Sequence, residues 1–587
     1  MRGRPLFSGR AASLLVVFVV AKAAALTGHH VPLSWWSPIA YIWQDVLVVL
    51  VFAAVDRWLD RWARVAWAAY AVLAFYAVVN IPVQRALSTP LTVAMWRAAR
   101  GPLADSIWLY ATWQTMLLLA AAAACVCLAP SCFRRASRQR VVAPLAACVL
   151  LGPTAVAHVD TLGLERNAWA ALAVSMAPRI AARRADADWR AKGFDQGAPD
   201  DLSRDRALRG AAAGRNIVLV SLESTSAAYL GVYGAKPDVM PHLSELARTA
   251  MVFDSAYAVY PESIKGLFSI LCSAYPSFDS SPEMYAAMPC RSLAATLGEA
   301  GYATALFHSG RFMYLGMEAV VRDRGYHTLE DAGDIGGDHT SSFGVDEPST
   351  VDRILRWIDG LPADRPFFVT YLPIAGHHPY ETPARGPFSD DDEFGRYRNA
   401  LDYGDRALGT LMRGLELRGR QPNTLWIVVG DHGEAFGQHE GNYGHTFHVY
   451  DENVRVPLLI SAAGLFPRQV RSRRVVSLID TAPTALEMVG IQPPAHYQGR
   501  SMLDGGPRMA LFFADYSLGM LGLRDGPMKF IYELDSGRSR MFDLESDPGE
   551  RLNVAGGNLE RAREYERLLR GWSAAQKEVL LAAARRP

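Results

Sequence analysis

Leu425-Trp-Ile-Val-Val-Gly-Asp-His-Gly-Glu434 is the stretch that decides the fold of the second half of the chain. A short apolar run, typical of a buried strand, is followed at once by Asp431 and His432, two potential metal ligands. Three further strands are predicted from similar apolar runs, at Asn216–Leu222, Ala303–Phe307 and Phe367–Leu372. Short buried strands that alternate with helical patterns predict an α/β sheet.

Potential ligands follow each of these three strands as well. Glu223 comes directly after the first strand, His308 after the second, and His377 and His378 shortly after the third. Ligands collect beyond the carboxyl ends of parallel strands, so we expect these side chains to meet at one edge of the sheet. A single histidine is more often a surface or core residue than a ligand. Their recurrence at strand ends favours a functional site.

Ser263 supplies a hydroxyl group to this predicted site. It stands just before a helical apolar pattern in Tyr260-Pro-Glu-Ser-Ile-Lys-Gly-Leu-Phe-Ser-Ile-Leu-Cys272, which predicts a helix N-cap, a nucleophile, or both. A helix N-terminus offers free N–H groups and a positive dipole end, which suit a bound phosphoryl group. Lys265, two residues on, is a candidate contact for a substrate anion.

The residues at the strand ends predict a divalent-metal site that includes the hydroxyl of Ser263. Carboxylate oxygens from Glu223 and Asp431, with an imidazole nitrogen from His432, suit zinc or manganese. Such an ion lowers the pKa of a coordinated hydroxyl, so Ser263 could act as a nucleophile that forms a covalent seryl ester. Three histidines are candidates for binding substrate oxygens or protonating the leaving group: His308, His377 and His445.

The first part of the chain is much more apolar than the rest. Half of all residues are hydrophobic, and nearly all the long apolar runs lie before Val159. Five segments approach the roughly 20 residues that a membrane-spanning helix needs, at 12–27, 38–55, 65–83, 107–128 and 141–159. We therefore predict a membrane domain (1–159), a linker with an amphipathic helix at Trp169–Arg184 (160–215), a catalytic domain (216–500) and a small C-terminal subdomain and tail (501–587).

Arginines indicate the orientation of the predicted spans. They are concentrated at 2–10, 57–64 and 134–140, in alternate loops, which the positive-inside rule assigns to the cytoplasm. An odd number of spans then places everything after Val159 outside the cytoplasm. There Cys272 and Cys290, about eighteen residues apart, predict a disulfide, with two buried free thiols as the alternative. The net charge of +1 disfavours a nucleic-acid partner.

These motifs resemble those of the sulfatase-like branch of the alkaline phosphatase superfamily. Asn216-Ile-Val-Leu-Val-Ser-Leu-Glu-Ser224 is similar to the first metal-ligand strand of the family, and Val429-Gly-Asp-His-Gly-Glu434 to its Asp-His-Gly signature. With five spans, the chain looks most like lipoteichoic acid synthases and lipid A phosphoethanolamine transferases. The resemblance implies a metal site made of Glu223, Ser263, Asp431 and His432. It also implies substrate contacts at His308, at His377 and at either His445 or His448.

Two departures from the family patterns bear on the reaction. The nucleophile of classical sulfatases lies in a Cys/Ser-x-Pro-x-Arg setting that permits conversion to formylglycine. Ser263 is followed instead by Ile-Lys-Gly-Leu, which favours an unmodified serine and phosphoryl transfer. Leu315-Gly-Met317 replaces the Trp-Asn-Arg headgroup contact of lipoteichoic acid synthases, which argues against glycerol phosphate as the transferred group.

The leading hypothesis is a phosphoalkyl transferase of the bacterial inner membrane with a periplasmic catalytic domain. It would move a headgroup such as phosphoethanolamine from a membrane phospholipid, through Ser263, to an envelope glycan or glycolipid. One alternative is a sulfatase, phosphomonoesterase or phosphodiesterase of the same superfamily, with water as the acceptor. Another is a non-catalytic envelope protein that binds glycans or other proteins. The oligomeric state stays open.

Overall fold

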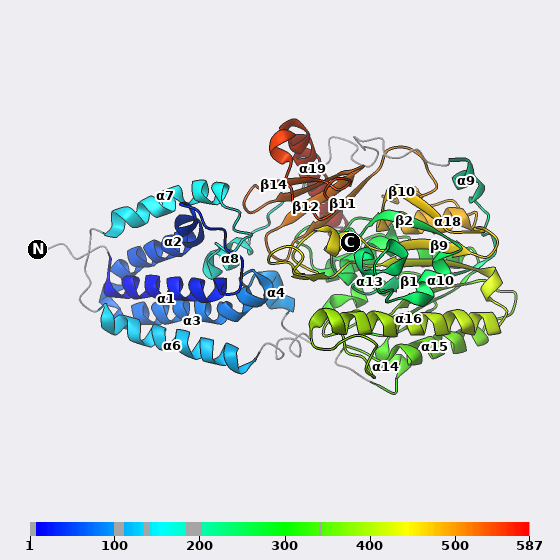
Figure 1. Ribbon diagram of the computed structural model, residues 1–587, viewed down its shortest axis with the longest axis horizontal. Coiled ribbons are helices and arrows are strands. Elements are labelled where there is room, and N and C mark those ends of the chain that lie inside the picture. The colour runs from blue at the N-terminus through cyan, green and yellow to red at the C-terminus, as the bar shows by residue number, and fades with distance from the viewer. Residues whose placement is uncertain (1–6, 99–110, 134–140, 184–201, 340–342, 586–587) are drawn as a thin grey trace, which may run out of the picture. The chain divides into compact units, whose positions relative to one another are not determined.

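The computed structural model describes residues 7–98, 111–133, 141–183, 202–339 and 343–585. The contacts within the chain divide it into two units (Figure 1). Unit 1 consists of Met1–Pro178 together with the short loop Gly437–Tyr443, and unit 2 consists of Arg179–Phe436 and Gly444–Pro587. The two units are described separately below.

Unit 1 is built from apolar helices. Four of its described helices are long and apolar enough to cross a membrane: α1 (Gly9–Leu26), α2 (Ser37–Trp58), α3 (Ala63–Leu87) and α6 (Trp113–Cys132). A fifth, α7 (Val142–His158), has 17 residues. At about 1.5 Å per residue it is about 26 Å long, less than the roughly 30 Å of a hydrocarbon core. The five predicted spans therefore correspond to four long apolar helices and one shorter helix. The fourth span was predicted at 107–128, and its residues 107–110 lie outside the described residues.

The segment that follows α7 contains a helix that is shorter than the one predicted at Trp169–Arg184. Helix α8 covers only Ala168–Val174, and the Asn167 side chain caps it by accepting hydrogen bonds from two backbone N–H groups. The helix ends before Pro178, because proline lacks an N–H group and disfavours helical geometry in the preceding residue. Residue 184 lies outside the described part of the chain. Two further short helices in these regions are α4 (Val93–Ala98) and α9 (Leu202–Ala207).

Unit 2 is centred on an eight-stranded sheet with the order β10-β2-β9-β6-β1-β5-β3-β4. The four strands predicted from apolar runs are all present, as β1 (Asn216–Leu222), β3 (Ala303–His308), β5 (Phe367–Leu372) and β6 (Thr424–Gly430). They are parallel to one another, with β1 between β5 and β6. The other strands are β2 (Ala250–Tyr257), β4 (Thr328–Glu330), β9 (Leu458–Ala462) and β10 (Val470–Ser477), and β9 runs antiparallel to both of its neighbours. The predicted α/β fold is confirmed.

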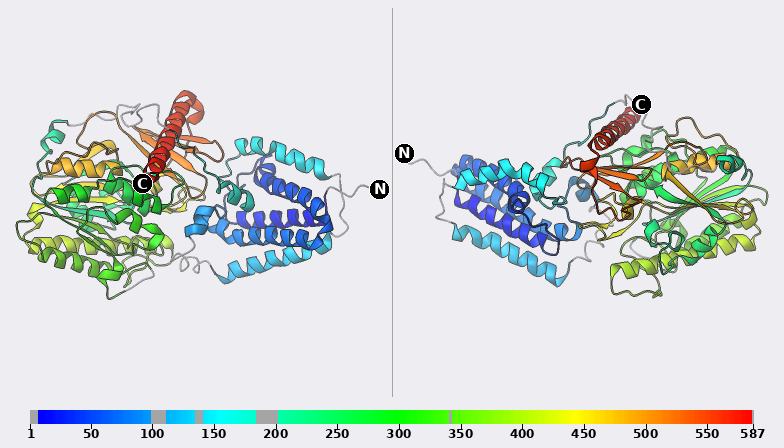
Figure 2. Two further views of the ribbon diagram at one scale, coloured as in Figure 1. Left: turned by 180° about the vertical axis from the view of Figure 1, so that it is seen from behind. Right: turned by 45° about the horizontal axis from the view of Figure 1, so that its top comes forward.

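Helices cover both faces of this sheet (Figure 2). Along β1, Val218 and Val220 belong to one hydrophobic core, whereas Ile217 and Leu219 belong to the other, as expected when successive side chains alternate across a sheet. The first core is shared with α10 (Pro241–Ala247), α15 (Glu347–Asp359) and α16 (Glu393–Leu417). The second is shared with α11 (Ser263–Cys272), α12 (Leu293–Glu299), α13 (Glu318–Val321) and α18 (Thr481–Met488). Two short helices of unit 2 are α14 (Ala332–Ile335) and α17 (Asp451–Val454). There are also two strands of two residues each, β7 (Ala435–Phe436) and β8 (Tyr443–Gly444). The boundary between the units falls within β8, because Tyr443 is assigned to unit 1 and Gly444 to unit 2.

A smaller antiparallel sheet follows in unit 2. Its order is β11-β12-β13-β14, from β11 (Met509–Ala514), β12 (Met520–Asp525), β13 (Met528–Glu533) and β14 (Ser539–Asp543). Helix α19 (Leu559–Ala584) packs on this sheet through the buried rings of Tyr565 and Trp572. Cys272, at the end of α11, forms a disulfide with Cys290, with a Cα–Cα distance of 5.5 Å.

Candidate active site

Ser263 is the first residue of α11, at the carboxyl edge of the large sheet. Its Oγ donates a hydrogen bond of 2.7 Å to Glu223 Oε2 and lies 3.2 Å from His432 Nε2. Glu223 directly follows β1 and His432 follows β6 by two residues, so parallel pairing of these strands brings both side chains to the serine. The positive end of the α11 dipole lies at the same place, which favours an anion beside Ser263.

Glu223, Asp431 and His432 form a buried group that could hold a metal ion. One ligand atom from each residue can be chosen so that all three lie within 4.8 Å of one another. His432 Nε2 is 3.4 Å from Glu223 Oε1 and 3.6 Å from Asp431 Oδ2. The other carboxylate oxygen of Asp431 accepts backbone hydrogen bonds from Ser224 and His432, which orients the free oxygen toward the centre of the group. Two oxygens and one nitrogen fit the predicted zinc or manganese ion.

The electrostatics of this group favour a positive charge beside the two carboxylates. Burial, together with the negative charge of Glu223, raises the pKa of Asp431 to about 7. Burial opposes the protonation of His432, but the nearby Asp431 and Glu223 outweigh it and raise its pKa to about 10. Without a metal, a proton on His432 therefore neutralises part of the carboxylate charge. A divalent cation would replace that proton and satisfy both carboxylates.

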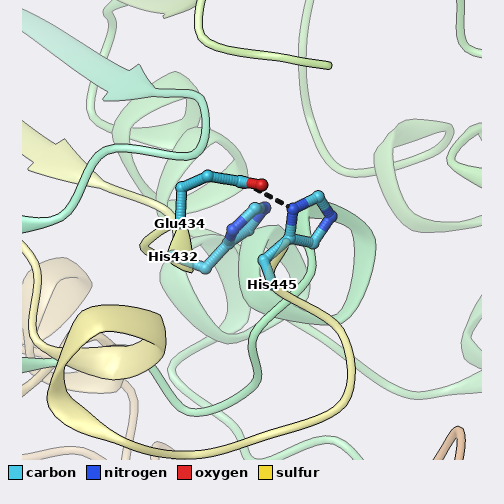
Figure 3. Close-up of side chains that lie close together, drawn as sticks. All are labelled: His432, Glu434 and His445. Carbon is cyan, nitrogen blue, oxygen red and sulfur yellow. Dashed lines mark hydrogen bonds and ion pairs between the residues drawn. The ribbon is translucent and has the colours of Figure 1, made fainter. Parts of the chain in front are cut away.

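His445 forms a second pair with Glu434, two residues after His432 (Figure 3). His445 Nδ1 is 2.7 Å from Glu434 Oε2, and the hydroxyl of Tyr380 donates to Glu434 Oε1 at 2.9 Å. The rings of His445 and His432 lie 4.3 Å apart, so the imidazole of His445 faces the group that could bind metal. Burial would raise the pKa of Glu434, yet the charge of His445 and this hydrogen bond lower it overall.

The other candidate histidines surround this centre. His308, the last residue of β3, is buried and has its Nδ1 3.1 Å from the carbonyl oxygen of Leu372. The His377 ring lies 6.3 Å from that of His445. Burial lowers the pKa of both His308 and His377, so both are neutral near pH 7. His448 instead stacks on Tyr450, at 5.8 Å between ring centroids, which leaves His445 as the histidine beside the metal group.

Lys265, which was predicted to contact a substrate anion, is buried and paired with a carboxylate of the protein. Its side chain is buried, and its Nζ forms an ion pair of 2.8 Å with Asp515 Oδ2. The charge expected to meet a substrate anion is thus neutralised within the protein. The sequence does not reveal this, because Asp515 lies 250 residues further along the chain.

Three functional features at this site were missed from the sequence. Glu434 belongs to the quoted Asp-His-Gly-Glu motif, and its position near two histidines was a usable signal. Tyr380 lies on a different loop and gave no such signal. Gly376 allows the chain to approach the first metal ligand closely, because a Cβ there would lie 2.2 Å from the carbonyl oxygen of Glu223.

Comparisons with known proteins agree with this geometry. The sulfatase family model matches residues 215–491. Lipoteichoic acid synthase-like YvgJ of Bacillus subtilis (strain 168) is 23% identical over 325 residues, which cover 51% of this chain and 52% of that protein. Arylsulfatase K of Xenopus laevis is 27% identical over 243 residues, covering 36% of this chain and 45% of its own length. The chain spans about half the length of the curated relatives it matches.

A solved structure shows the same fold. It is a protein in the alkaline phosphatase superfamily from Vibrio parahaemolyticus, with a TM-score of 0.53 and 22% identity, and the match covers 66% of this chain and 97% of that one. The parallel strands, the ligands at their carboxyl ends and the family match all concern the same part of the chain. Residues 215–491 match the sulfatase family model, and this part of the chain has the same fold as the Vibrio parahaemolyticus protein.

Proposed function

We propose that this protein is a membrane-anchored, metal-dependent transferase that takes a phosphoalkyl group from a phospholipid and passes it to a cell-envelope acceptor. The observation that carries the proposal is the position of Ser263. Its hydroxyl lies at a helix N-terminus, 2.7 Å from a carboxylate oxygen of the group that could bind metal. The four long apolar helices of unit 1 support anchoring in the membrane that holds the lipid donor.

The residues of this chain have distinct parts in the proposed reaction. Ser263 Oγ forms a bond to phosphorus while the bond from phosphorus to the diacylglycerol oxygen breaks, giving a seryl phosphodiester and diacylglycerol. Glu223, Asp431 and His432 would hold a zinc or manganese ion, which lowers the pKa of the serine hydroxyl and neutralises charge on the phosphoryl oxygens.

His445, oriented by Glu434, donates a proton to the departing diacylglycerol oxygen. It then accepts a proton from the hydroxyl or amine of the acceptor as that group attacks the seryl ester and releases Ser263. His308 and His377 are neutral near pH 7 because burial lowers the pKa of each, so their ring N–H groups can bind the phosphoryl oxygens.

A cavity beside His377 supports a cationic headgroup such as phosphoethanolamine. It is open to solvent, and about 450 Å³ of space lies between its walls and its mouth. Its described lining residues contain three carboxylates and several rings but no lysine or arginine: His339, Phe343, Val345, Asp346, Glu347, Ile374, Ala375, His377, Pro379, Glu381, Pro383 and Tyr403. An ammonium group is attracted both by carboxylates and by aromatic faces. Glu347 contributes little to this attraction, because both of its oxygens accept hydrogen bonds within the protein and burial raises its pKa.

Asp346 keeps a negative charge in this cavity. Burial opposes its ionisation, but hydrogen bonds from the backbone N–H of His339 and from Ser349 lower its pKa overall. The headgroup of phosphatidylethanolamine would therefore bind with its phosphate at Ser263 and its ammonium group toward Asp346. This arrangement favours phosphoethanolamine over glycerol phosphate, which carries no cation.

The second candidate function is hydrolysis of sulfate or phosphate esters, which the similarity to arylsulfatase K supports. In that case water would attack the ester and no lipid would be needed. The Ser-Ile-Lys-Gly context of Ser263 argues for an unmodified serine and thus for the transferase. A third possibility, a non-catalytic envelope protein, predicts that the purified full-length chain neither retains metal nor turns over esters.

The test uses the full-length protein in vesicles of headgroup-labelled phosphatidylethanolamine. Wild-type protein should release diacylglycerol, and Ser263→Ala should abolish the release. Ser269→Ala is a matched control, because Ser269 lies on the same helix but its hydroxyl donates to the backbone of that helix. Undiminished release by Ser263→Ala would rule the proposal out. Turnover of soluble aryl sulfates or phosphates without lipid, together with no diacylglycerol release, would favour the hydrolase.

A further inference from the structure

The segment that carries Ser263 is attached on both of its sides to one carboxylate. Tyr260, three residues before the serine, donates from its hydroxyl to Asp515 Oδ1 at 2.5 Å. Lys265, two residues after the serine, donates from Nζ to Asp515 Oδ2 at 2.8 Å. The ammonium group of Lys265 also lies 4.3 Å from the centre of the Tyr260 ring. Ser263 therefore stands between two contacts that converge on the same side chain.

Asp515 belongs to the small C-terminal sheet, directly after β11. Its side chain is only 6% exposed, and that of Lys265 only 5%. The backbone N–H of Asp279 donates a further hydrogen bond to Asp515 Oδ2 at 2.8 Å. The carboxylate thus accepts three hydrogen bonds, from a phenol, an ammonium group and a backbone amide, and both of its oxygens are used.

Arg179, the first residue of unit 2, holds the loop around Asp515. Its guanidinium donates to the carbonyl oxygens of Asp515 at 2.6 Å and Ser517 at 2.7 Å. Its backbone N–H donates to Asp279 Oδ2 at 2.9 Å. Arg179 and the small sheet therefore both hold Asp515 in position.

We propose that Asp515 is a positioning residue for the nucleophile, acting through Tyr260 and Lys265 to set the direction of Ser263 Oγ. The proposal rests on the proposed function of Ser263 as the nucleophile. It gives the C-terminal sheet a part in catalysis, since that sheet supplies the carboxylate that orients the first turn of α11.

Helix geometry explains why this attachment matters. Successive residues of an α-helix are rotated by about 100°, so Lys265 points away from Ser263, and fixing Lys265 fixes the rotation of the helix about its axis. At a helix radius of about 2.3 Å, a rotation of about 25° moves a Cα atom by about 1 Å. Displacement of a reacting group by that amount can reduce the rate about 100-fold.

Stability alone does not explain the choice of residues. A buried ion pair is often no more stabilising than well-packed apolar side chains of similar volume, whereas it does impose a specific orientation. The hydrogen bonds of Tyr260 and Lys265 each end on a particular oxygen of Asp515, a directional constraint that two apolar side chains would not supply. We therefore expect substitutions of Asp515 to affect the rate of attack more than the binding of the lipid.

The test compares Asp515→Asn with Asp205→Asn in the full-length protein in phosphatidylethanolamine vesicles, with an added acceptor alcohol or amine so that Ser263 turns over and kcat is defined. Asp205 is a matched control, because it is also a buried carboxylate with a cationic partner, Arg474 at 2.7 Å. Asp515→Asn should lower kcat about 10- to 100-fold, with less than about a 3-fold change in KM and unchanged metal content. Asp205→Asn should leave kcat within about 2-fold of the wild type. If Asp515→Asn does not fold, Tyr260→Phe provides the same test, with an expected loss in kcat of about 3- to 10-fold.

Rescue separates positioning from a general structural role. Asp515→Glu keeps the carboxylate and should recover part of the kcat that Asp515→Asn loses, whereas Asp515→Ala should not. A folded Asp515→Asn variant with wild-type kcat, or one in which only KM changes, would overturn the proposal. Ser263→Ala is measured alongside, because activity in that variant would overturn the proposed nucleophile itself rather than the role of Asp515.

Discussion

Replacement of Glu434 by glutamine should slow the transferase reaction without emptying the metal site. In the structure Glu434 orients His445, and it is not a member of the group formed by Glu223, Asp431 and His432. It does belong to a second group that could hold a metal ion, together with His432 and His445, so the metal content of the variant is measured alongside its rate. Glutamine has nearly the same shape but no charge. The variant should therefore remove the negative charge beside the His445 ring. It should also permit the tautomer in which Nδ1 carries no proton, because the glutamine amide can donate to Nδ1.

The size of the effect follows from the hydrogen bond that is lost. The 2.7 Å contact between His445 Nδ1 and Glu434 Oε2 involves an ionised carboxylate and is partly buried. Hydrogen bonds to charged groups contribute about 1.5–3 kcal/mol. Because about 1.4 kcal/mol corresponds to a tenfold change in rate, kcat should fall by about 10- to 150-fold.

Diacylglycerol release from phosphatidylethanolamine, measured with full-length protein and an added acceptor alcohol or amine so that Ser263 turns over, tests this expectation. Tyr380→Phe is the control, since it removes a hydrogen bond to the same carboxylate but leaves both the charge of Glu434 and its bond to His445. It should therefore reduce kcat less than Glu434→Gln does. Wild-type kcat in Glu434→Gln would refute the role of the pair, and loss of bound metal would show that Glu434 holds the ion instead.

Four further outcomes are expected. Replacing both Cys272 and Cys290 with alanine should lower the free energy of unfolding by about 3 kcal/mol, because the disulfide spans 18 residues, and an unchanged urea midpoint would contradict this. Burial raises the pKa of Asp405 to about 7, above the usual value of about 3.9, so the folded protein keeps a proton that the unfolded chain releases between about pH 4 and 7. Stability should therefore fall with rising pH in that window, by up to about 1.4 kcal/mol per pH unit, and Asp405→Asn should flatten the slope of the unfolding midpoint against pH. Gly376→Ala should weaken metal binding about 10- to 100-fold in a metal titration, whereas Gly571→Ala, whose new Cβ meets nothing within 4 Å, should not. A chelator should stop headgroup release, and zinc or manganese should restore it; activity that survives complete metal removal would contradict the account.

The central strands could be predicted from the sequence because each is buried on both faces. In β1 and β5 every residue is buried, so the apolar run and the strand have the same bounds. The edge strand β10 could not be predicted in this way. Its first half alternates exposed arginines with less exposed residues, and the pattern becomes apolar only near its end.

The group that could bind metal could also be predicted, since Glu223, Asp431 and His432 come just after those strands. What the sequence could not supply are contacts between distant loops. Tyr380 and Glu434 are 54 residues apart and meet only because their strands lie in the same sheet. The contact of Lys265 with Asp515 could not be predicted for the same reason, because Asp515 lies 250 residues away, just after a strand of the other sheet.

The mass of the peptide that carries Ser263 tests the central claim most directly. Full-length protein is incubated with phosphatidylethanolamine without an acceptor, quenched in acid and digested, and the peptide is compared with that from resting protein. We predict an unmodified serine in the resting protein and a phosphoethanolamine adduct on Ser263 after incubation. Formylglycine at residue 263, or a serine that stays unmodified while diacylglycerol is released, would contradict the account.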